Sequence, residues 1–200
     1  MSRFDEQARD WDTPQRRERA EAVAGVIRAS VALTPSMRAV DIGAGTGLLG
    51  LALASDVGEM VLAEPSTGML EVMRDKLAAG GPANVTAAAF DVLTDAPPGE
   101  PFDLAVSLLV LHHLPDPAAA LKALAGLLRS GGRLALADLD TEDGSFHADA
   151  TGIHFLGFER DDIVRIARAA GFSDVETRTA TEIEREGRRY PVFLLLGRKP

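Results

Sequence analysis

The chain has 200 residues and a mass of 21.2 kDa, with 46% apolar and 26% charged residues and a formal net charge of −9. This composition is typical of one globular domain with a sizeable core, and the surplus of acid argues against nucleic acid or an anionic membrane surface as the partner. The absence of cysteine excludes disulfides, thiolate metal ligands and a cysteine nucleophile.

The hydrophobic pattern alternates between helical stripes and short apolar runs. In chain order it predicts a helix over 13–33, a strand over 38–42, a helix over 48–54, a strand over 60–63 and a helix over 69–77 that stops before Gly80-Gly81. Strands follow over 85–90 and 104–109, then a helix over 121–128 closed by Gly131-Gly132, a strand over 134–139 and a helix over 163–170. The last two strands, over 175–180 and 190–196, have no helix between them and should form an antiparallel hairpin at one edge of the sheet.

These elements predict an α/β fold, a doubly wound three-layer sandwich with a mostly parallel sheet. No repeat or linker divides the chain, so we expect one domain over residues 1–200. The first residues lack a basic-then-apolar export signal, and the longest apolar run, 104–111, is too short to span a membrane. A cytoplasmic location without membrane attachment is therefore expected.

A glycine-rich turn follows the first strand, in the run Val40-Asp41-Ile42-Gly43-Ala44-Gly45-Thr46-Gly47. Glycines at alternating positions let the backbone turn tightly and approach a ligand closely. The helix that follows offers its unpaired N–H groups at the same place, and ligands of such sheets bind at the carboxyl ends of the strands. The turn therefore predicts a ligand site.

Carboxylates end the next two predicted strands. Glu64 lies 64 − 43 = 21 residues after the first glycine, where a carboxylate can accept both hydroxyls of a ribose. Asp91 ends the third strand, where it can accept a hydrogen bond from an adenine amino group. Together with the turn they predict an adenosine-like ligand.

The identity of that ligand has two interpretations at this level. The run 45–50 matches the dinucleotide pattern G-x-G-x-x-G, with Glu64 19 residues beyond Gly45, so an NAD-dependent oxidoreductase is one alternative. Asp41, two residues before the first glycine, suits an ammonium group better than a pyrophosphate. The terminal hairpin has no role in a dinucleotide fold either.

The ordered motifs VDIGAGTG, LAEPS, FDV, FDLAVSLLVLHHLPD and LLRSGGRLALAD resemble those of the class I S-adenosylmethionine-dependent methyltransferases, in particular their small-molecule branch. The resemblance covers about half the chain, roughly 38–138. It implies a seven-stranded sheet in the order 3-2-1-4-5-7-6 with strand 7 antiparallel. It also implies transfer of a methyl group from S-adenosylmethionine to a small molecule, with release of S-adenosylhomocysteine. A regulatory module that binds the cofactor without turnover is the non-enzymatic alternative.

The resemblance also implies which residues bind the cofactor. Asp41 and the turn would hold the methionine part, Glu64 the ribose, and Asp91 with Val92 the adenine. The 1–35 segment would cap the pocket through Trp11, or Trp11 would only anchor the first helix. The complete expected set is Trp11, Asp41, Gly43, Ala44, Gly45, Thr46, Gly47, Glu64, Pro65, Ser66, Met69, Asp91, Val92, Ser107 and Leu108.

Methyl transfer depends mainly on alignment of the acceptor, so a general base is optional. The candidates are His112 and His113 after the fourth strand, and His154 in the 140–158 loop, which should rim the acceptor side together with His147. Each histidine has an alternative structural role in packing or at a helix start. No metal is expected, and the arginines at 16–19 and 185–189 are expected to lie on solvated faces. Aromatic residues in the loop favour an apolar or aromatic acceptor, whose identity the sequence leaves open, as it does the oligomeric state.

Overall fold

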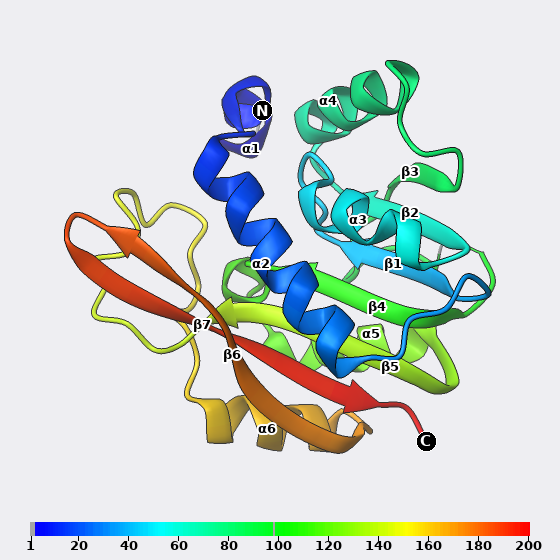
Figure 1. Cartoon of the computed structure of the whole chain (residues 1–200). Helices are drawn as coiled ribbons and strands as arrows, with labels where there is room; N and C mark the ends of the chain where they lie inside the picture. The colour runs from blue at the N-terminus through cyan, green and yellow to red at the C-terminus, as the bar shows by residue number, and fades with distance from the viewer. Residues whose placement is uncertain (1–2, 98) are drawn as a thin grey trace.

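The computed structural model describes residues 3–97 and 99–200, shown as a ribbon in Figure 1. The helices are α1 (Arg3–Gln7), α2 (Pro14–Ser30), α3 (Leu48–Leu53), α4 (Thr67–Ala78), α5 (Pro117–Leu127) and α6 (Arg160–Ala169), with short 3₁₀ turns η1 (Ala8–Asp10), η2 (Ala54–Asp56) and η3 (Leu111–His113). The strands are β1 (Arg38–Ile42), β2 (Glu59–Glu64), β3 (Val85–Ala89), β4 (Phe102–Leu108), β5 (Leu128–Leu139), β6 (Ser173–Arg185) and β7 (Arg188–Arg198). Within the described ranges, no helix combines the length and the apolar character needed to cross a membrane.

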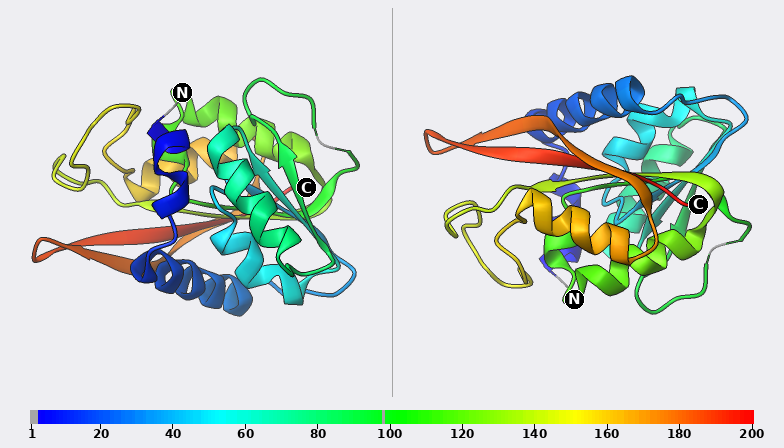
Figure 2. Two further views of the ribbon diagram at one scale, coloured as in Figure 1. Left: turned by 90° about the horizontal axis from the view of Figure 1, so that it is seen from above. Right: turned by 90° about the horizontal axis from the view of Figure 1, so that it is seen from below.

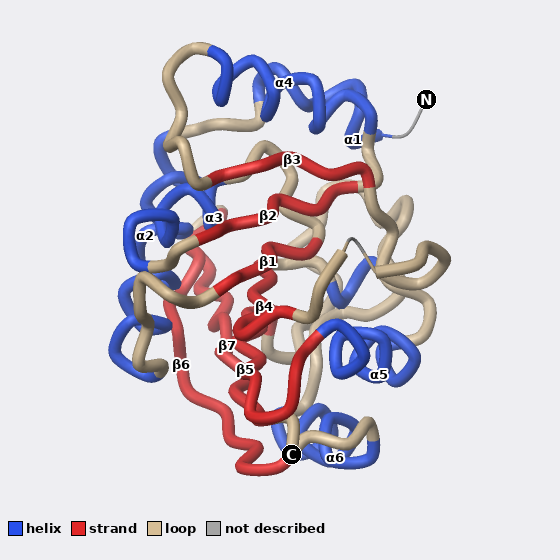
Figure 3. The backbone as a smooth tube through the Cα atoms, turned by 90° about the vertical axis from the view of Figure 1, so that its right-hand side faces the viewer, coloured by secondary structure: helices blue, strands red, loops and turns tan. Residues whose placement is uncertain are grey.

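The seven strands form one sheet in the order β3-β2-β1-β4-β5-β7-β6 (Figure 3). The strands β3, β2, β1, β4 and β5 are parallel to one another. Strand β7 runs antiparallel to both of its neighbours, β5 and β6. The central strands are buried on both faces, as a parallel sheet requires; β4 is buried from Phe102 to Ser107. The predicted fold class, strand order and terminal hairpin are confirmed.

Helices cover both faces of the sheet, as the right-hand view of Figure 2 shows with α2 on one side and α5 and α6 on the other. Val23 and Ile27 of α2 are fully buried in the same core as α3 and α4, whereas Leu121 of α5 and Ile163 of α6 are buried in the core on the opposite face. Capping side chains fix where three of these helices begin. Thr13, Ser66 and Asp116 each accept a hydrogen bond from a backbone N–H in the first turn of α2, α4 and α5.

Several predicted boundaries differ from the structure. The first predicted helix ends at Ser30, and a short α1 precedes it that the periodicity did not reveal. Helix α5 starts at Pro117, because Asp116 caps it, and ends at Leu127. The glycines 131 and 132 therefore lie inside the span of β5, where the register with β4 shifts between Phe102 and Leu104, and do not form the helix stop.

The 140–158 loop is tied to the turn end of the β6–β7 hairpin, and both extend away from the helices at the left of Figure 1. The Ser145 Oγ and Tyr190 Oη atoms are 2.7 Å apart, and the Arg188 guanidinium is 3.0 Å from the Asp143 carboxylate. A bridge between Asp140 and Phe158 closes the loop. The loop is thereby held beside the carboxyl ends of the strands.

The closure of this loop gives a stability prediction. Gly157 has a φ of +76°, and a Cβ there would lie 2.1 Å from the carbonyl oxygen of Asp140, whereas Gly152 has a φ of +74° with no atom within 4 Å of such a Cβ. We expect Gly157→Ala to lower the free energy of unfolding by about 2–4 kcal/mol, because backbone strain is added to a backbone collision. Gly152→Ala should cost only the strain of the positive φ, about 1–2 kcal/mol. Urea denaturation of both variants checks this. Equal losses in the free energy of unfolding would show that the collision with Asp140 adds no cost.

Candidate functional site

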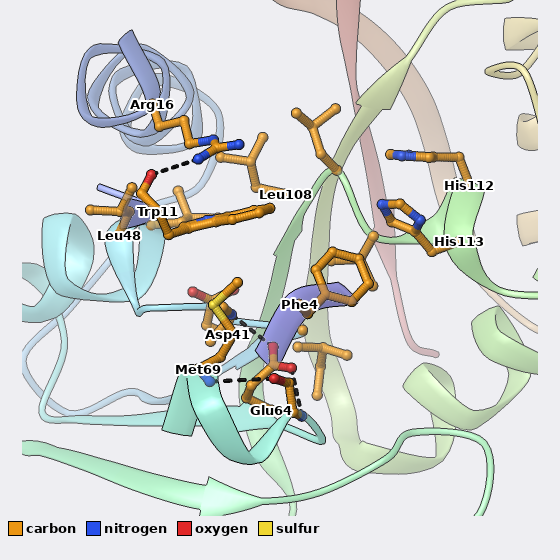
Figure 4. Close-up of a pocket in the computed structure, with 18 of the residues that line it drawn as sticks. Phe4, Trp11, Arg16, Asp41, Leu48, Glu64, Met69, Leu108, His112 and His113 are labelled. Carbon is orange, nitrogen blue, oxygen red and sulfur yellow. Dashed lines mark hydrogen bonds between the residues drawn. The ribbon is translucent and has the colours of Figure 1, made fainter. Parts of the chain in front are cut away.

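A cavity of about 760 Å³ opens at the carboxyl ends of the parallel strands (Figure 4). The glycine turn after β1 and the ends of β2, β3 and β4 form its floor. The N-terminal segment, the 140–158 loop and the end of β6 contribute its rim. In Figure 4, Trp11 and Arg16 lie on one side of the cavity, with His112 and His113 on the other. The volume is within the range of pockets that bind a cofactor or drug-sized molecule.

The glycine turn is held in a conformation that side chains would disrupt. Gly43 and Gly45 have φ angles of +64° and +58° and line the cavity, and a Cβ on Gly43 would lie 2.6 Å from Val110. The turn therefore exposes bare backbone to whatever the cavity holds.

Asp41 lies beneath this turn and is 1% exposed. Its Oδ2 accepts a hydrogen bond of 2.9 Å from the Gly50 N–H. Burial, with a further contribution from the charge of Glu64, raises the pKa of Asp41 to about 7. A cationic ligand group next to this carboxylate would stabilise its ionised form.

Glu64, the last residue of β2, accepts a hydrogen bond on each oxygen. The Gly45 N–H donates to Oε2 at 2.8 Å, and the Ser66 N–H donates to Oε1 at 2.9 Å. A carboxylate has about four acceptor positions, so two remain for a ligand. Burial raises the pKa of Glu64 above its usual value. This arrangement fits a side chain that accepts from two vicinal hydroxyls.

Asp91 lies just beyond β3 and lines the same cavity. Its Oδ1 accepts a hydrogen bond of 2.9 Å from the Leu93 N–H, which fixes the carboxylate at the start of the turn after the strand. The structure thus brings Asp41, Glu64 and Asp91 from three neighbouring strands to one cavity.

Most of the other expected cofactor residues also line it, namely Trp11, Ala44, Pro65, Ser66, Met69, Val92 and Leu108. Thr46, Gly47 and Ser107 do not. The Thr46 hydroxyl donates to Asp12, Gly47 caps α3 with its φ of +88°, and the Ser107 hydroxyl donates to the Ile42 carbonyl at 2.8 Å, behind the cavity wall. In this structure these contacts hold the turn and the strand ends together.

His112 forms a buried pair with Asp138, the residue before the end of β5. Its Nδ1 lies 2.6 Å from Asp138 Oδ1, while the His112 backbone N–H donates to Oδ2 at 3.1 Å. Asp138 has no exposed surface, so its carboxylate fixes the hydrogen of His112 on Nδ1. The Nε2 atom is buried and has no hydrogen-bond partner among the described residues.

The remaining histidines separate into two groups. His113 lines the cavity, and its Nδ1 is 2.9 Å from the Gly152 carbonyl oxygen; burial and the neighbouring His112 lower its pKa to about 4. His147 also lines the cavity, with its ring centroid 5.1 Å from that of His112. His154 is exposed and outside the cavity, and its backbone N–H donates to the His112 carbonyl at 3.0 Å. The loop thus brings His147, not His154, to the site.

Arginines from two regions reach the cavity, which corrects the expectation that they lie on solvated faces. Arg16, Arg19 and Arg185 line it, whereas Arg17 and Arg189 are exposed. The spacing of Arg16 and Arg19, which places both on one face of a helix, could have indicated this. Asp138 could also have been found, because it is another carboxylate near a strand end.

The N-terminal segment is held over the cavity by polar contacts. The carboxylate of Asp5 accepts hydrogen bonds from the Ser66 hydroxyl at 2.7 Å and from the Gly68 N–H at 3.0 Å. The Arg16 guanidinium lies 3.8 Å from the centre of the Trp11 ring and donates to the Trp11 carbonyl at 2.8 Å. In the part of the chain that is described, no group of three or more His, Asp or Glu side chains is arranged to hold a metal ion.

Known proteins with similar sequences are methyltransferases by name. Residues 40–134 match a family model described as a methyltransferase domain. The ubiquinone biosynthesis O-methyltransferase of Xanthomonas campestris pv. campestris is 30% identical over 131 residues, which cover 65% of this chain and 54% of that protein. The chain thus spans about half the length of the curated relatives it matches.

Solved structures share the fold. The N-methyltransferase NodS of Bradyrhizobium japonicum, solved with S-adenosylhomocysteine, superposes with a TM-score of 0.70 at 20% identity and covers 96% of this chain and 91% of that one. The phosphoethanolamine N-methyltransferase 2 of Haemonchus contortus, solved with S-adenosylmethionine, gives 0.74 at 20% identity over 90% of this chain and 52% of that one. The match over residues 40–134 and the shared fold confirm the resemblance of the ordered motifs to the class I S-adenosylmethionine-dependent methyltransferases.

Proposed function

We propose that this chain transfers a methyl group from S-adenosylmethionine to a small-molecule acceptor and releases S-adenosylhomocysteine. The observation that carries the proposal is the convergence of Asp41, Glu64 and Asp91 with a bare glycine turn on one cavity. This arrangement fits the cofactor. Asp41 is an anionic partner for an ammonium, Glu64 has two oxygens that can accept from a ribose, and Asp91 can accept from an adenine amino group.

Different residues would bind different parts of the cofactor. Asp41 and the turn would hold the α-ammonium end. Arg16, which packs on the ring of Trp11 where that ring adjoins Gly45, would pair with the carboxylate. Glu64 would accept from both ribose hydroxyls. Asp91, Val92 and Met69 would border the adenine. When bound, S-adenosylmethionine supplies an electrophilic methyl group.

The structure favours this cofactor over NAD. The literal dinucleotide pattern needs free backbone N–H groups at 45–50 for a pyrophosphate. Here the Gly45 N–H is bonded to Glu64 and the Gly50 N–H to Asp41. A pyrophosphate would also lie beside two carboxylates, which is electrostatically unfavourable.

His112 is the general base in this proposal. Asp138 would orient the ring and stabilise it once protonated, and Nε2 would accept a proton from the acceptor. His113, with its pKa lowered to about 4, is neutral near pH 7 and would orient the acceptor. The curated relatives are O-methyltransferases by name, which supports a hydroxyl acceptor.

Calorimetry with S-adenosylmethionine, S-adenosylhomocysteine and NAD tests the cofactor. We expect both S-adenosyl compounds to bind and NAD not to bind. Formation of S-adenosylhomocysteine with a panel of aromatic hydroxyl compounds then separates an enzyme from a regulatory binding module. Binding without product from any acceptor would favour the module, and NAD binding alone would overturn the proposal.

The pH dependence of binding follows from Asp41. Because burial holds its pKa near 7 instead of 3.8, the group is largely protonated below pH 7 and must ionise to pair with an ammonium. Affinity for S-adenosylhomocysteine should therefore rise with pH up to about 7, by at most about tenfold per pH unit, and then level off. Calorimetry at pH 6, 7 and 8 measures this. Asp41→Asn should bind more weakly and lose the slope; an unchanged slope would place the titrating group elsewhere.

A further inference from the structure

Three arginines line the cavity, in a chain whose net charge is −9. Arg16 and Arg19 are one turn apart on α2, so both project to the same side of the helix. Arg185, the last residue of β6, lines the cavity as well and donates to the Phe146 carbonyl. Strand β6 packs against α2, as the hydrogen bond of 3.4 Å from Arg178 to Ser30 shows.

Arg16 already has a place in the proposed cofactor site, beside Trp11 and the glycine turn. S-adenosylmethionine has one carboxylate, and one guanidinium is sufficient to bind it in the bidentate manner. Arg19 is therefore a second cation that the cofactor does not require.

Arg19 lacks a counter-charge among the residues that the structure describes. None of the described carboxylates forms an ion pair with it, and its pKa is lowered to about 10 by burial and by the positive charge of Arg16. Glu184 also lines the cavity, but it is exposed and does not pair with Arg19. A partly buried cation beside another cation is costly unless an anion joins it.

Apolar groups line the same cavity. Ile183 and Phe146 are buried and line the cavity next to Arg185 and His147. A ligand that reached from His112 to Arg19 would therefore have an apolar or aromatic body between a reacting hydroxyl and an anionic group.

We propose that Arg19, assisted by Arg185, binds an anionic group of the methyl acceptor, either a carboxylate or a phosphate. The planar guanidinium fork matches both groups. This inference rests on the proposed function, because that function assigns Arg16 to the cofactor and leaves Arg19 for the acceptor.

Calorimetry on the complex with S-adenosylhomocysteine tests the inference with three probes: benzoate, phenyl phosphate and the neutral benzamide. We expect at least one anionic probe to bind about tenfold or more tighter than benzamide, because charge-assisted hydrogen bonds are about twice as strong as neutral ones. The tighter of the two anions identifies the group.

Arg19→Gln should reduce this preference to about twofold or less while S-adenosylhomocysteine affinity stays within about threefold of that of the unmodified protein. Arg19→Lys keeps the charge without the fork and should give an intermediate preference. Arg165→Gln is the matched control, since it removes the same charge from an exposed position on α6, across the sheet, and should leave the preference intact.

Two results would overturn the inference: no preference for either anion, or an Arg19→Gln variant that loses S-adenosylhomocysteine affinity and keeps the preference. The second result would assign Arg19 to the cofactor. Failure of S-adenosylhomocysteine to bind would instead contradict the proposed function. The same probes titrated without it still report whether Arg19 binds anions.

Discussion

Replacing Glu64 by alanine is expected to weaken binding of S-adenosylmethionine and S-adenosylhomocysteine by about 10²-fold or more. The change would remove the proposed acceptor of two hydrogen bonds from the ribose, and a hydrogen bond to a charged group contributes about 1.5–3 kcal/mol. It also leaves the N–H groups of Gly45 and Ser66 without their partner, so the turn loses its fixed position.

Calorimetry of Glu64→Ala and Glu64→Gln measures this effect, with Glu59→Gln as the control. Glu59 lies at the opposite end of the same strand, where it pairs with Arg38 at 2.8 Å on the surface. Glu64→Gln keeps one acceptor oxygen and should give an intermediate loss. If Glu64→Ala bound the cofactor as tightly as Glu59→Gln, the ribose assignment would be wrong.

Replacing His112 by asparagine is expected to lower kcat for a hydroxyl acceptor by about 10²–10⁴-fold, the usual contribution of a general base. Affinity for S-adenosylhomocysteine should change little, because the cofactor residues lie across the cavity. His113→Asn is the matched control: the His113 pKa of about 4 makes this side chain a poor base near neutral pH, so a loss of less than about tenfold is expected.

The rate of S-adenosylhomocysteine formation at saturating S-adenosylmethionine distinguishes the two histidines. A larger loss in His113→Asn than in His112→Asn would reverse their roles. Asp138→Asn tests the positioning residue, since it removes the carboxylate that fixes the hydrogen on Nδ1. It should lower kcat and alter the pH profile while leaving the cofactor affinity unchanged.

The sequence was most informative where local chemistry determines the structure. Buried β-strands consist of short apolar runs, and a turn with φ angles near +60° requires glycine, so the sheet and the Gly43–Gly47 turn were predictable. The carboxylates 41, 64 and 91 were found because parallel strands end at the same edge of the sheet. Thr46, Gly47 and Ser107 belong to the same motifs, but neighbouring polar groups engage them behind the cavity wall.

Residues positioned by long-range packing were not predictable in this way. Helix α1 is too short to show a periodicity, and its place over the cavity depends on Asp5 contacting Ser66 at the start of α4, 61 residues away. Whether His147 or His154 faces the cavity depends on how the 140–158 loop folds against the hairpin. The same applies to Arg19 and Arg185, whose surroundings only the tertiary structure defines.

A crystal structure of the chain with S-adenosylhomocysteine tests the central claim most directly. The account predicts hydrogen-bond distances, about 2.5–3.2 Å, from the Glu64 carboxylate to both ribose hydroxyls, with the ammonium next to Asp41 and the adenine amino group next to Asp91. A ligand bound elsewhere, or bound in this cavity without contact to Glu64, would contradict it.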